Sequence, residues 1–470
     1  MKSQPQYIHP LEPIAAIATA IGESAIAIVR TSGEGCFERC DRVFRKAGDS
    51  NFTLASAPSH TAHYGFIVNE KGETIDEVMA IVYRSPKSFT TEDSVEINCH
   101  GGVVVTQAVL RALLDAGFRL AEPGEFTRRA FLAGRIDLLQ AEAIGELIHA
   151  KTDAAYRAAI SHLKGDLSKQ LMLMRDNLLN ACALLELELD FGEEDVEFQN
   201  RSQLKDSLIA LQTVLEDLLA SFQTGKRIAE GVSVAIVGRP NAGKSTLLNA
   251  LLGKDRAIVS SIAGTTRDFI QESFTYEGAL FQLIDTAGLR KTKDFVEQEG
   301  IRRSYEKIEE ADLILYLYDA SQPIPAEELE EAKQLRLKNP NVPFLHVPNK
   351  CDRPEAMHHI LKNEDSAVCP ISALNGEGIA ALKAEMKRLT LDSQKRHEGS
   401  LLLTNLRHYE AVRNALQSVV NAHYLTDHNL ETELIASDLR DALHHIGTIT
   451  GKVATDEILN TIFAKFCIGK

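Results

Sequence analysis

One short run of residues constrains the fold of this chain more than any other feature. Residues 238–245 read Gly-Arg-Pro-Asn-Ala-Gly-Lys-Ser, after the apolar segment Val232 to Val237 and before a helix expected near Ser245. A glycine-rich loop between a strand and a helix directs successive backbone N–H groups and the positive helix end toward one point. The spacing therefore predicts a strand–loop–helix unit that binds the β- and γ-phosphates of a nucleotide.

The side chains of this loop have separate tasks. Lys244 supplies a fixed positive charge to the phosphates and is a catalytic candidate, while the Ser245 hydroxyl is a ligand for Mg²⁺. A chance glycine loop is the alternative, and further motifs at the ends of predicted strands argue against it. The expected nucleotide contacts in the loop are Asn241, Ala242, Gly243, Lys244, Ser245 and Thr246.

Two further motifs follow buried apolar segments. After Ile284, an aspartate can hold Mg²⁺ through water and a glycine amide can meet the γ-phosphate. After Val347, Asp352 can accept hydrogen bonds from the N1 and N2 groups of guanine. Adenine lacks these donors, so the sequence predicts GTP rather than ATP as the substrate. The expected contacts are Asp285, Thr286, Ala287 and Gly288, then Asn349, Lys350 and Asp352, and finally Ser372 and Ala373, which close over the base.

Periodic apolar residues predict two long helices ahead of the nucleotide motifs. Leucines and related residues recur at steps of three and four from Leu167 to Leu189, and again from Leu204 to Phe222. Such spacing places them on one face of each helix, and each face must pack against another element. We interpret both stripes as core rather than as a cofactor-binding surface.

The predicted elements divide the chain, which at 470 residues is too long for a single core, into three domains. Short apolar runs between glycine-containing turns, such as Glu77 to Tyr83, indicate an α+β fold in the first domain. Beyond Gly231, apolar strands alternate with helices, which is typical of an inserted α/β domain with a doubly wound parallel sheet. The expected boundaries are 1–132 for the α+β domain, 133–228 with 393–470 for a discontinuous helical-bundle domain, and 229–392 for the insertion.

Charge and cysteine content limit the partners and the compartment. Lys and Arg number 51 against 66 Asp and Glu, and the net charge of −15 requires any RNA contact to be local. The segment Met1 to Pro13 lacks a signal-like apolar run, so we expect a cytoplasmic protein with no membrane segment. The 7 cysteines are scattered, which fits a reducing compartment, and we interpret Cys36 and Cys40 as packing residues rather than metal ligands.

Hydrolysis of GTP needs a group that orients water, and the glutamine that often does so is absent. Leu289 follows Gly288, where Ras-like GTPases carry that glutamine. Residues 264–268, Gly-Thr-Thr-Arg-Asp, lie where a switch loop is expected, and Thr266 is placed to ligate Mg²⁺. Together with Asn241, this loop resembles the potassium-binding arrangement of cation-activated GTPases, in which K⁺ replaces an arginine finger.

Two assignments of the transition-state charge stay open. The resemblance to cation-activated GTPases implies K⁺ ligands at Asn241, Ser260, Ile262 and Thr265. The competing assignment is Arg267 acting in cis, and only the first assignment makes hydrolysis much faster in K⁺ than in Na⁺. The expected nucleotide contacts of this loop are Ser260, Ser261, Ile262, Ala263, Gly264, Thr265 and Thr266.

Further motifs lie outside the nucleotide site. They are Pro-Gly-Glu-Phe-Thr at 123–127, Gln-Ala-Glu-Ala at 140–143 and Phe-Cys-Ile-Gly-Lys at 466–470. With the nucleotide motifs, they make the chain resemble the MnmE (TrmE) family of tRNA-modification GTPases along its whole length. The resemblance implies a folate-binding-like N-terminal domain, a helical bundle and an inserted Ras-like P-loop GTPase domain. It also implies K⁺-stimulated GTP hydrolysis and addition of an aminomethyl or carboxymethylaminomethyl group to carbon 5 of wobble uridine in tRNA.

The same resemblance implies partners and a second cofactor. The chain would form a homodimer through its N-terminal domains and a hetero-oligomer with the flavoprotein MnmG (GidA), which alone carries FAD. Methylene- or formyl-tetrahydrofolate would supply the one-carbon unit. The implied folate-binding residues are Arg30, Glu96, Arg135 and Lys470. Some relatives have lysine at position 135, and arginine there keeps the charge but changes the donor geometry.

Two catalytic candidates come from the resemblance alone. Glu297 would position the attacking water in place of the missing glutamine, and Cys467 is a candidate nucleophile near the end of the chain. The structural alternatives are a solvated helix face for Glu297 and an inert thiol for Cys467.

Other functions are compatible with parts of the sequence. A GTPase switch acting in ribosome assembly would bind RNA without modifying it, but such proteins carry an appended basic RNA-binding domain that this acidic chain lacks. A folate-dependent aminomethyltransferase without a nucleotide would leave the guanine-reading motifs unexplained.

Overall fold

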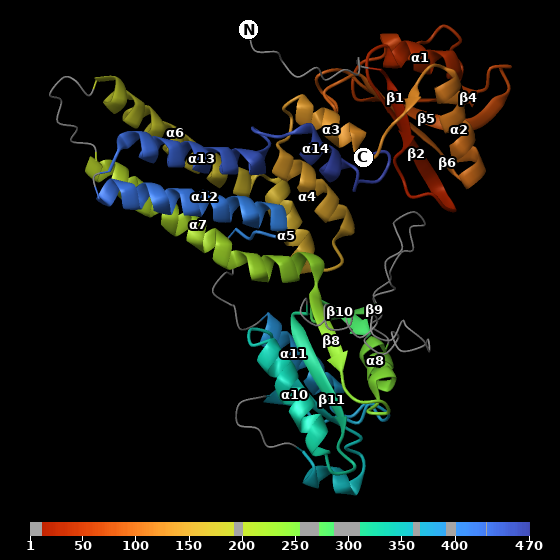
Figure 1. The fold of residues 1–470 in the computed structure, drawn as a ribbon. Helices are drawn as coiled ribbons and strands as arrows, with labels where there is room; N and C mark the ends of the chain where they lie inside the picture. The colour runs from red at the N-terminus through yellow and green to blue at the C-terminus, as the bar shows by residue number, and fades with distance from the viewer. Residues whose placement is uncertain are drawn as a thin grey trace, which may run out of the picture. The chain divides into compact units, whose positions relative to one another are not determined.

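The computed structural model describes residues 12–191, 201–253, 272–285, 311–360, 367–391, 401–428 and 430–470, and Figure 1 traces them. Contacts within the chain divide it into two units, Met1–Gly145 with Gly447–Lys470, and Glu146–Ile446. The residues of the expected helical domain are shared between these units. The three-domain boundaries therefore stay a prediction.

A mixed sheet forms the frame of the first unit. Its strand order is β3-β4-β5-β6-β2-β1-β7, in which β1 and β7 are parallel and the other neighbours are antiparallel. The strands are β1 (Ile14–Ile17), β2 (Ser24–Ser32), β3 (Phe44–Lys46), β4 (Thr61–Val68), β5 (Thr74–Tyr83), β6 (Ser94–Gly101) and β7 (Arg119–Leu120). The helices are α1 (Cys36–Val43), η1 (Leu54–Ser56), α2 (Val103–Asp115), α3 (Glu125–Leu132), most of α4 (Leu138–His149) and α14 (Asp456–Phe463).

Side chains of this sheet alternate between two faces. On one face, Val29 and Ile97 belong to a buried cluster with residues of α1 and α2. Cys36 and Cys40 lie fully buried in the same cluster, so both thiols are part of the core. On the other face, residues of β1 share a smaller cluster with Phe126 of α3. An antiparallel-rich sheet with helices against it confirms the predicted α+β fold.

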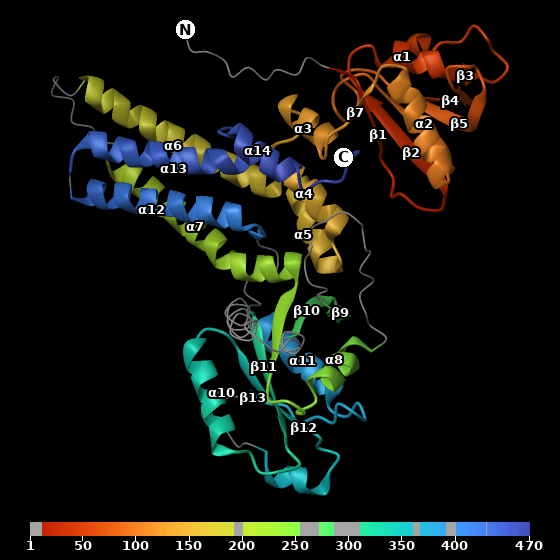
Figure 2. The ribbon, with the colours of Figure 1, turned by 45° about the vertical axis from the view of Figure 1, so that its right-hand side comes forward.

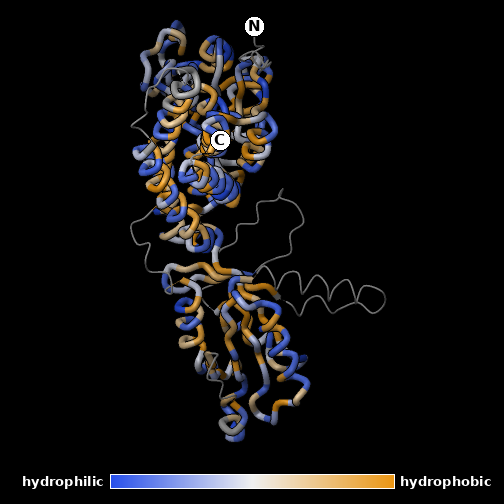
Figure 3. The backbone as a smooth tube through the Cα atoms, turned by 60° about the vertical axis from the view of Figure 1, so that its left-hand side comes forward, coloured by the Kyte–Doolittle hydropathy of each residue, from blue (hydrophilic) through white to orange (hydrophobic). Residues whose placement is uncertain are grey.

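Helices formed by the first and the last residues of the second unit run side by side (Figure 2). They are α5 (Asp153–Leu163), α6 (Asp166–Phe191), α7 (Arg201–Glu230), α12 (Leu406–Asp427) and α13 (Thr432–Thr450), the last of which ends in the first unit. Hydrophobic and hydrophilic residues alternate along the described backbone in Figure 3. Among the described helices, none combines the length and the apolarity that crossing a membrane requires.

The predicted stripes are the core of these helices. The described stripe residues of α6 and α7 are buried: Leu167, Leu171, Met174, Leu178, Cys182, Leu185, Leu204, Leu208, Leu211, Leu215, Leu218 and Phe222. Periodicity thus predicted the buried sides of α6 and α7. In α13, Ile435 and Leu439 are buried whereas Leu434 is 50% exposed.

The middle of the second unit's sequence forms a second sheet, whose strand order is β13-β12-β11-β8-β10-β9. Only β9 is antiparallel to its neighbour. The strands are β8 (Val232–Val237), β9 (Glu272–Tyr276), β10 (Ala279–Asp285), β11 (Leu313–Asp319), β12 (Phe344–Asn349) and β13 (Ala367–Val368). The helices with them are α8 (Lys244–Leu252), α10 (Ala326–Lys338), η3 (Pro354–His358) and α11 (Ile379–Thr390).

Helices cover both faces of this parallel sheet. Leu247 of α8 and Leu382 of α11 lie in a cluster with Leu315, whereas Leu335 of α10 lies with Tyr316 on the opposite face. Neighbouring residues of β11 therefore point to different helices, which explains why the strand is buried from Leu313 to Tyr318. The arrangement confirms the predicted α/β fold and brings the carboxyl ends of β8, β10, β11 and β12 to one edge.

Candidate nucleotide-binding site and a second polar site

The phosphate loop leaves the carboxyl end of β8 and leads into α8. Its first glycine, Gly238, lies against strand β11, where a Cβ atom would collide with the carbonyl oxygen of Leu317. Gly243 has a φ of +102°, and a Cβ there would collide with the Nδ2 atom of Asn349. Both glycines are therefore required by close approach of neighbouring strands or loops. The loop is built as a strand–loop–helix unit, as its spacing predicts.

The charged and hydroxyl side chains of this loop lie at the start of α8. Lys244 is the first residue of the helix, and its Nζ atom donates to the carbonyl oxygens of Gly238 at 2.7 Å and Arg239 at 2.9 Å. The ammonium group is thus held inside the curve of the loop. Ser245 follows in the first helical turn and is exposed, so its hydroxyl is accessible to a cation.

Asn349 joins the phosphate loop to the loop that contains Ser372 and Ala373. Its side-chain amide donates to the carbonyl oxygen of Ala242 at 2.8 Å, and its side-chain oxygen accepts from the backbone N–H of Ala373 at 3.0 Å. Asn349 is 3% exposed, so both hydrogen bonds are shielded from water. Three predicted contact segments, far apart in sequence, therefore meet at one buried amide.

The residues predicted to read guanine follow directly at the end of β12. Lys350 has a φ of +65°, a left-handed conformation that turns the chain sharply after the strand. Asp352 is exposed, so its carboxylate is available to a ligand. Ser372 is 1% exposed, and its backbone N–H donates to the Glu377 carbonyl oxygen at 3.0 Å, which fixes that loop.

Other predicted residues are only partly described or lie outside the described residues. Asp285 ends β10, and its backbone is paired in register with Ile236, beside the start of the phosphate loop. The predicted residues outside the described part of the chain are Ser260, Ser261, Ile262, Ala263, Gly264, Thr265, Thr266, Arg267, Thr286, Ala287, Gly288 and Glu297.

Arg30 and Glu96 form the centre of a second polar site in the first unit. They are paired in register on β2 and β6. Glu96 Oε1 accepts from Arg30 Nε at 2.8 Å and forms an ion pair with Arg30 Nη2, also at 2.8 Å. The ring of Phe89 lies near two cations, with its centroid 5.7 Å from Arg30 Cζ and 5.0 Å from Arg135 Cζ. Arg135 also donates from Nη1 to the carbonyl oxygen of Phe89 at 2.7 Å.

The end of the chain packs beside this group. Burial, followed by the positive charge of Arg30, lowers the pKa of Lys470, while Cys467 and Glu96 act in the opposite direction. Gly469 has a φ of +94° and lies so close to the Ile17 carbonyl oxygen that a Cβ would collide with it. The last residues are therefore fixed on the end of β1 rather than trailing from the surface.

The four residues implied for the folate site are thus brought together. Two guanidinium groups lie near the Phe89 ring, the Glu96 carboxylate pairs with one of them, and the Lys470 ammonium group lies close to Arg30 and Glu96. This donor set fits a folate, which presents a flat pterin ring with amide-like hydrogen-bonding groups and an anionic tail. Cys467 is exposed in the same tail, and its backbone carbonyl accepts from the N–H of Gly124 at 3.4 Å.

Some residues of these sites carried no sequence signal. Phe89 belongs to no predicted motif, and its place between two arginines depends on the loop before β6. Tyr83, whose hydroxyl lies 3.4 Å from Glu96 Oε2, read only as part of an apolar strand. Tyr83 ends β5, and a polar aromatic residue at a strand end is a signal that could have suggested it, whereas Phe89 in the loop before β6 had no such signal.

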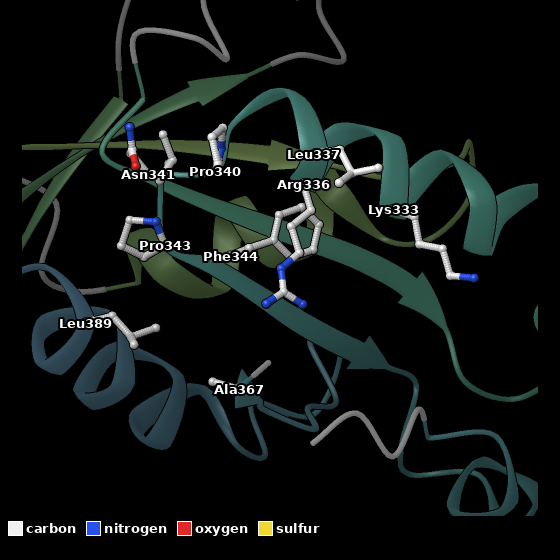
Figure 4. A pocket seen from close by; sticks show the side chains of 10 residues that line it. Lys333, Arg336, Leu337, Pro340, Asn341, Pro343, Phe344, Ala367 and Leu389 are labelled. Carbon is white, nitrogen blue, oxygen red and sulfur yellow. The ribbon is translucent and has the colours of Figure 1, made fainter. Parts of the chain in front are cut away.

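A separate cavity opens at the opposite edge of the α/β sheet (Figure 4). Lys333 and Arg336 of α10 line it together with Phe344, the first residue of β12. Because Asn349 ends the same strand, the cavity lies at the edge away from the nucleotide motifs.

Comparison with known proteins covers nearly the whole chain. A model of the MnmE helical domain matches residues 138–467, and a model of the GTP-binding protein TrmE N-terminus matches residues 13–135. Proteins named tRNA modification GTPase MnmE from Chlorobium chlorochromatii and Chlorobaculum tepidum are each 54% identical over 98% of both chains. The protein of the same name from Salinibacter ruber is 45% identical, over 98% of this chain and 99% of the Salinibacter chain.

Solved structures match a smaller part. The G domain of the T. maritima FeoB iron transporter, at 28% identity and a TM-score of 0.26, covers 34% of this chain and 98% of its own. The family matches and the full-length relatives support one assignment. This chain belongs to the MnmE family of tRNA modification GTPases.

Proposed function

We propose that this chain hydrolyses GTP with Mg²⁺ in a K⁺-stimulated reaction and thereby takes part in modifying wobble uridine in tRNA. The product would carry an aminomethyl or carboxymethylaminomethyl group at carbon 5, made together with the flavoprotein MnmG (GidA), which holds the FAD. The proposal includes a homodimer and a cytoplasmic location. Membership of the MnmE family and the guanine-nucleotide motifs support it.

The observation that carries the GTPase proposal is the buried amide of Asn349. It links the loop that would hold the phosphates to the loop that would close over the base, by hydrogen bonds of 2.8 and 3.0 Å. A nucleotide bound along this edge would meet Lys244 and the N–H groups of the phosphate loop at one end and Asp352 at the other. The site would therefore bind both the phosphates and the base of a guanine nucleotide.

The residues divide the catalytic work between charge and positioning. Lys244 would neutralise the phosphates, while Ser245 and Thr266 would hold Mg²⁺, which supplies charge to the β- and γ-phosphates. Asn241, Ser260, Ile262 and Thr265 would hold K⁺, and Glu297 would orient the attacking water. The competing source of transition-state charge is Arg267. Preorganised charge of this kind accelerates phosphoryl transfer by about a thousandfold or more.

The second polar site would bind methylene- or formyl-tetrahydrofolate. Glu96 would accept hydrogen bonds from the pterin, while Arg30, Arg135 and Lys470 would provide positive charge. The folate would bring the one-carbon unit for the uridine. Cys467 is exposed in the same tail as Lys470 and is proposed as a further candidate for the chemistry.

Two measurements test these proposals. GTP hydrolysis by the purified protein should be about a thousandfold faster in KCl than in NaCl if K⁺ supplies the transition-state charge. Equal rates would remove K⁺ and favour Arg267. Mass spectrometry of wobble uridine from cells lacking the protein should show loss of the carbon 5 group. If the amount of modified wobble uridine equals that of normal cells, the tRNA function is contradicted and a role in ribosome assembly is favoured.

A further inference from the structure

Asp319 lies at the nucleotide edge of the α/β sheet but belongs to none of the nucleotide motifs. It is the last residue of β11, the strand beside β12, and its backbone is paired in register with Asn349. Its Oδ2 atom is 2.5 Å from Lys350 Nζ, which follows Asn349 in the guanine-reading motif. An acidic side chain from one strand thus holds a motif lysine that begins the next loop.

The carboxylate of Asp319 is itself fixed. Its Oδ1 atom accepts from the backbone N–H of Ser321 at 2.9 Å and from the Ser321 hydroxyl at 2.6 Å. Burial by itself would raise the pKa of Asp319, but the hydrogen bonds from Lys350 and Ser321 lower it overall, so the group is ionised at neutral pH. The side chains of Asp319 and Lys350 are 17% and 29% exposed, so water weakens this pair only in part.

The backbone adds a second link between the same two loops. The N–H of Ala320 donates to the carbonyl oxygen of Asn349 at 3.0 Å. Asn349 is in turn bound to Ala242 and Ala373 through its side chain. The turn after β12 is therefore bonded to three neighbouring segments. Among the residues that the structure describes, Asp319 is the one that binds the lysine side chain.

The position of Lys350 makes this tie relevant to ligand binding. Its backbone is left-handed, and without a partner a lysine side chain has many rotamers. Fixing the ammonium group restricts the rotamers of this side chain, two residues before Asp352 in the guanine-reading motif. A side chain that is already ordered loses less entropy when a ligand binds.

We propose that Asp319 is a positioning residue for guanine recognition, which acts by holding Lys350 in the conformation that receives the base. The inference rests on the proposed GTPase function and assigns a role to a residue outside its motifs. Asp319 need not touch the nucleotide. Its removal should weaken binding of GDP and GTP alike, because both carry the same base.

The test measures GDP affinity of the full-length protein by calorimetry and GDP release by fluorescence of a labelled analogue. Asp319→Asn keeps the size of the side chain and removes its charge, and the dissociation constant should rise about tenfold. Lys350→Met should also weaken binding. In the double variant, Asp319→Asn should add almost nothing to the effect of Lys350→Met, because the residue through which it acts is gone.

Two further variants separate positioning from general damage. Glu277→Gln removes the partner of Lys387, an ion pair of 2.8 Å in the same domain with 61% exposure of the glutamate, and should leave GDP affinity unchanged. Ser321→Ala removes one of the bonds to Asp319 and should raise the dissociation constant about twofold to threefold. This milder variant tests the idea even if Asp319→Asn lowers the unfolding temperature.

The outcomes are distinct. Unchanged or tighter GDP binding by Asp319→Asn would overturn the inference, since tighter binding would mean that the pair competes with the nucleotide. Equal effects of Asp319→Asn with and without Lys350→Met would also overturn it. Failure of the unaltered protein to bind GDP would instead refute the proposed GTPase function.

Discussion

Replacing Gly469 by alanine tests whether the end of the chain completes the second polar site. Gly469 has a φ of +94°, a conformation that costs an L-residue about 1–2 kcal/mol. The added Cβ would also collide with the Ile17 carbonyl oxygen, which belongs to strand β1 and cannot move without disturbing the sheet. We therefore expect the tail to shift rather than the strand.

The size of the effect follows from what holds the tail in place. The N–H of Gly124 reaches the Cys467 carbonyl oxygen at 3.4 Å, and Ile468 forms a single bridge with Pro123. Each such bond contributes about 1 kcal/mol, so together they do not outweigh the strain and the collision. Loss of Lys470 from the site removes one charged hydrogen bond to a ligand, about 1.5–3 kcal/mol, or roughly tenfold to a hundredfold in affinity.

The assay is calorimetric binding of 5-formyltetrahydrofolate to the full-length protein, with GDP binding as an internal control. Gly48→Ala is the matched variant, because Gly48 has a φ of +76° and open space around its Cβ position. It introduces the same kind of backbone strain far from the tail and should leave folate affinity unchanged. Equal folate affinity in Gly469→Ala and Gly48→Ala would refute the reasoning, whereas weakened GDP binding would indicate general misfolding.

Three further predictions concern the second unit. Asn349→Ala leaves two buried backbone groups without partners, at about 1–3 kcal/mol each, so calorimetry should detect GDP binding weakened at least a hundredfold. Hydrogen bonds from His162 and others outweigh burial and lower the pKa of Glu146 below its ordinary 4.5. The ionised Glu146 therefore stabilises the fold above about pH 4.5, and this stabilisation is lost as the pH falls through the lowered pKa. The urea concentration at the midpoint of unfolding should consequently fall less steeply with acidification in Glu146→Gln than in the unaltered protein. Arg227→Met leaves Asp312 partly buried without its 2.8 Å partner and should cost about 3 kcal/mol in urea unfolding. A loss below about 0.5 kcal/mol would mean that this pair behaves as a surface pair.

The sequence by itself determined the elements and the local chemistry. Continuous apolar runs revealed the strands that precede the nucleotide motifs, and apolar residues at a spacing near 3.6 revealed the stripes of α6 and α7. The phosphate loop was equally readable, because its glycines and Lys244 act within one continuous segment. Such features depend on residues that are neighbours in the sequence, so they can be predicted without knowledge of the fold.

Only the tertiary structure decided which segments meet. Asn349 contacts Ala242 from 107 positions away, and Lys470 lies beside Arg30 although they come from opposite ends of the chain. These contacts follow from the strand order and from the path of the terminal tail. No local sequence pattern predicts either of them, because the free energy of long-range contacts depends on the whole fold.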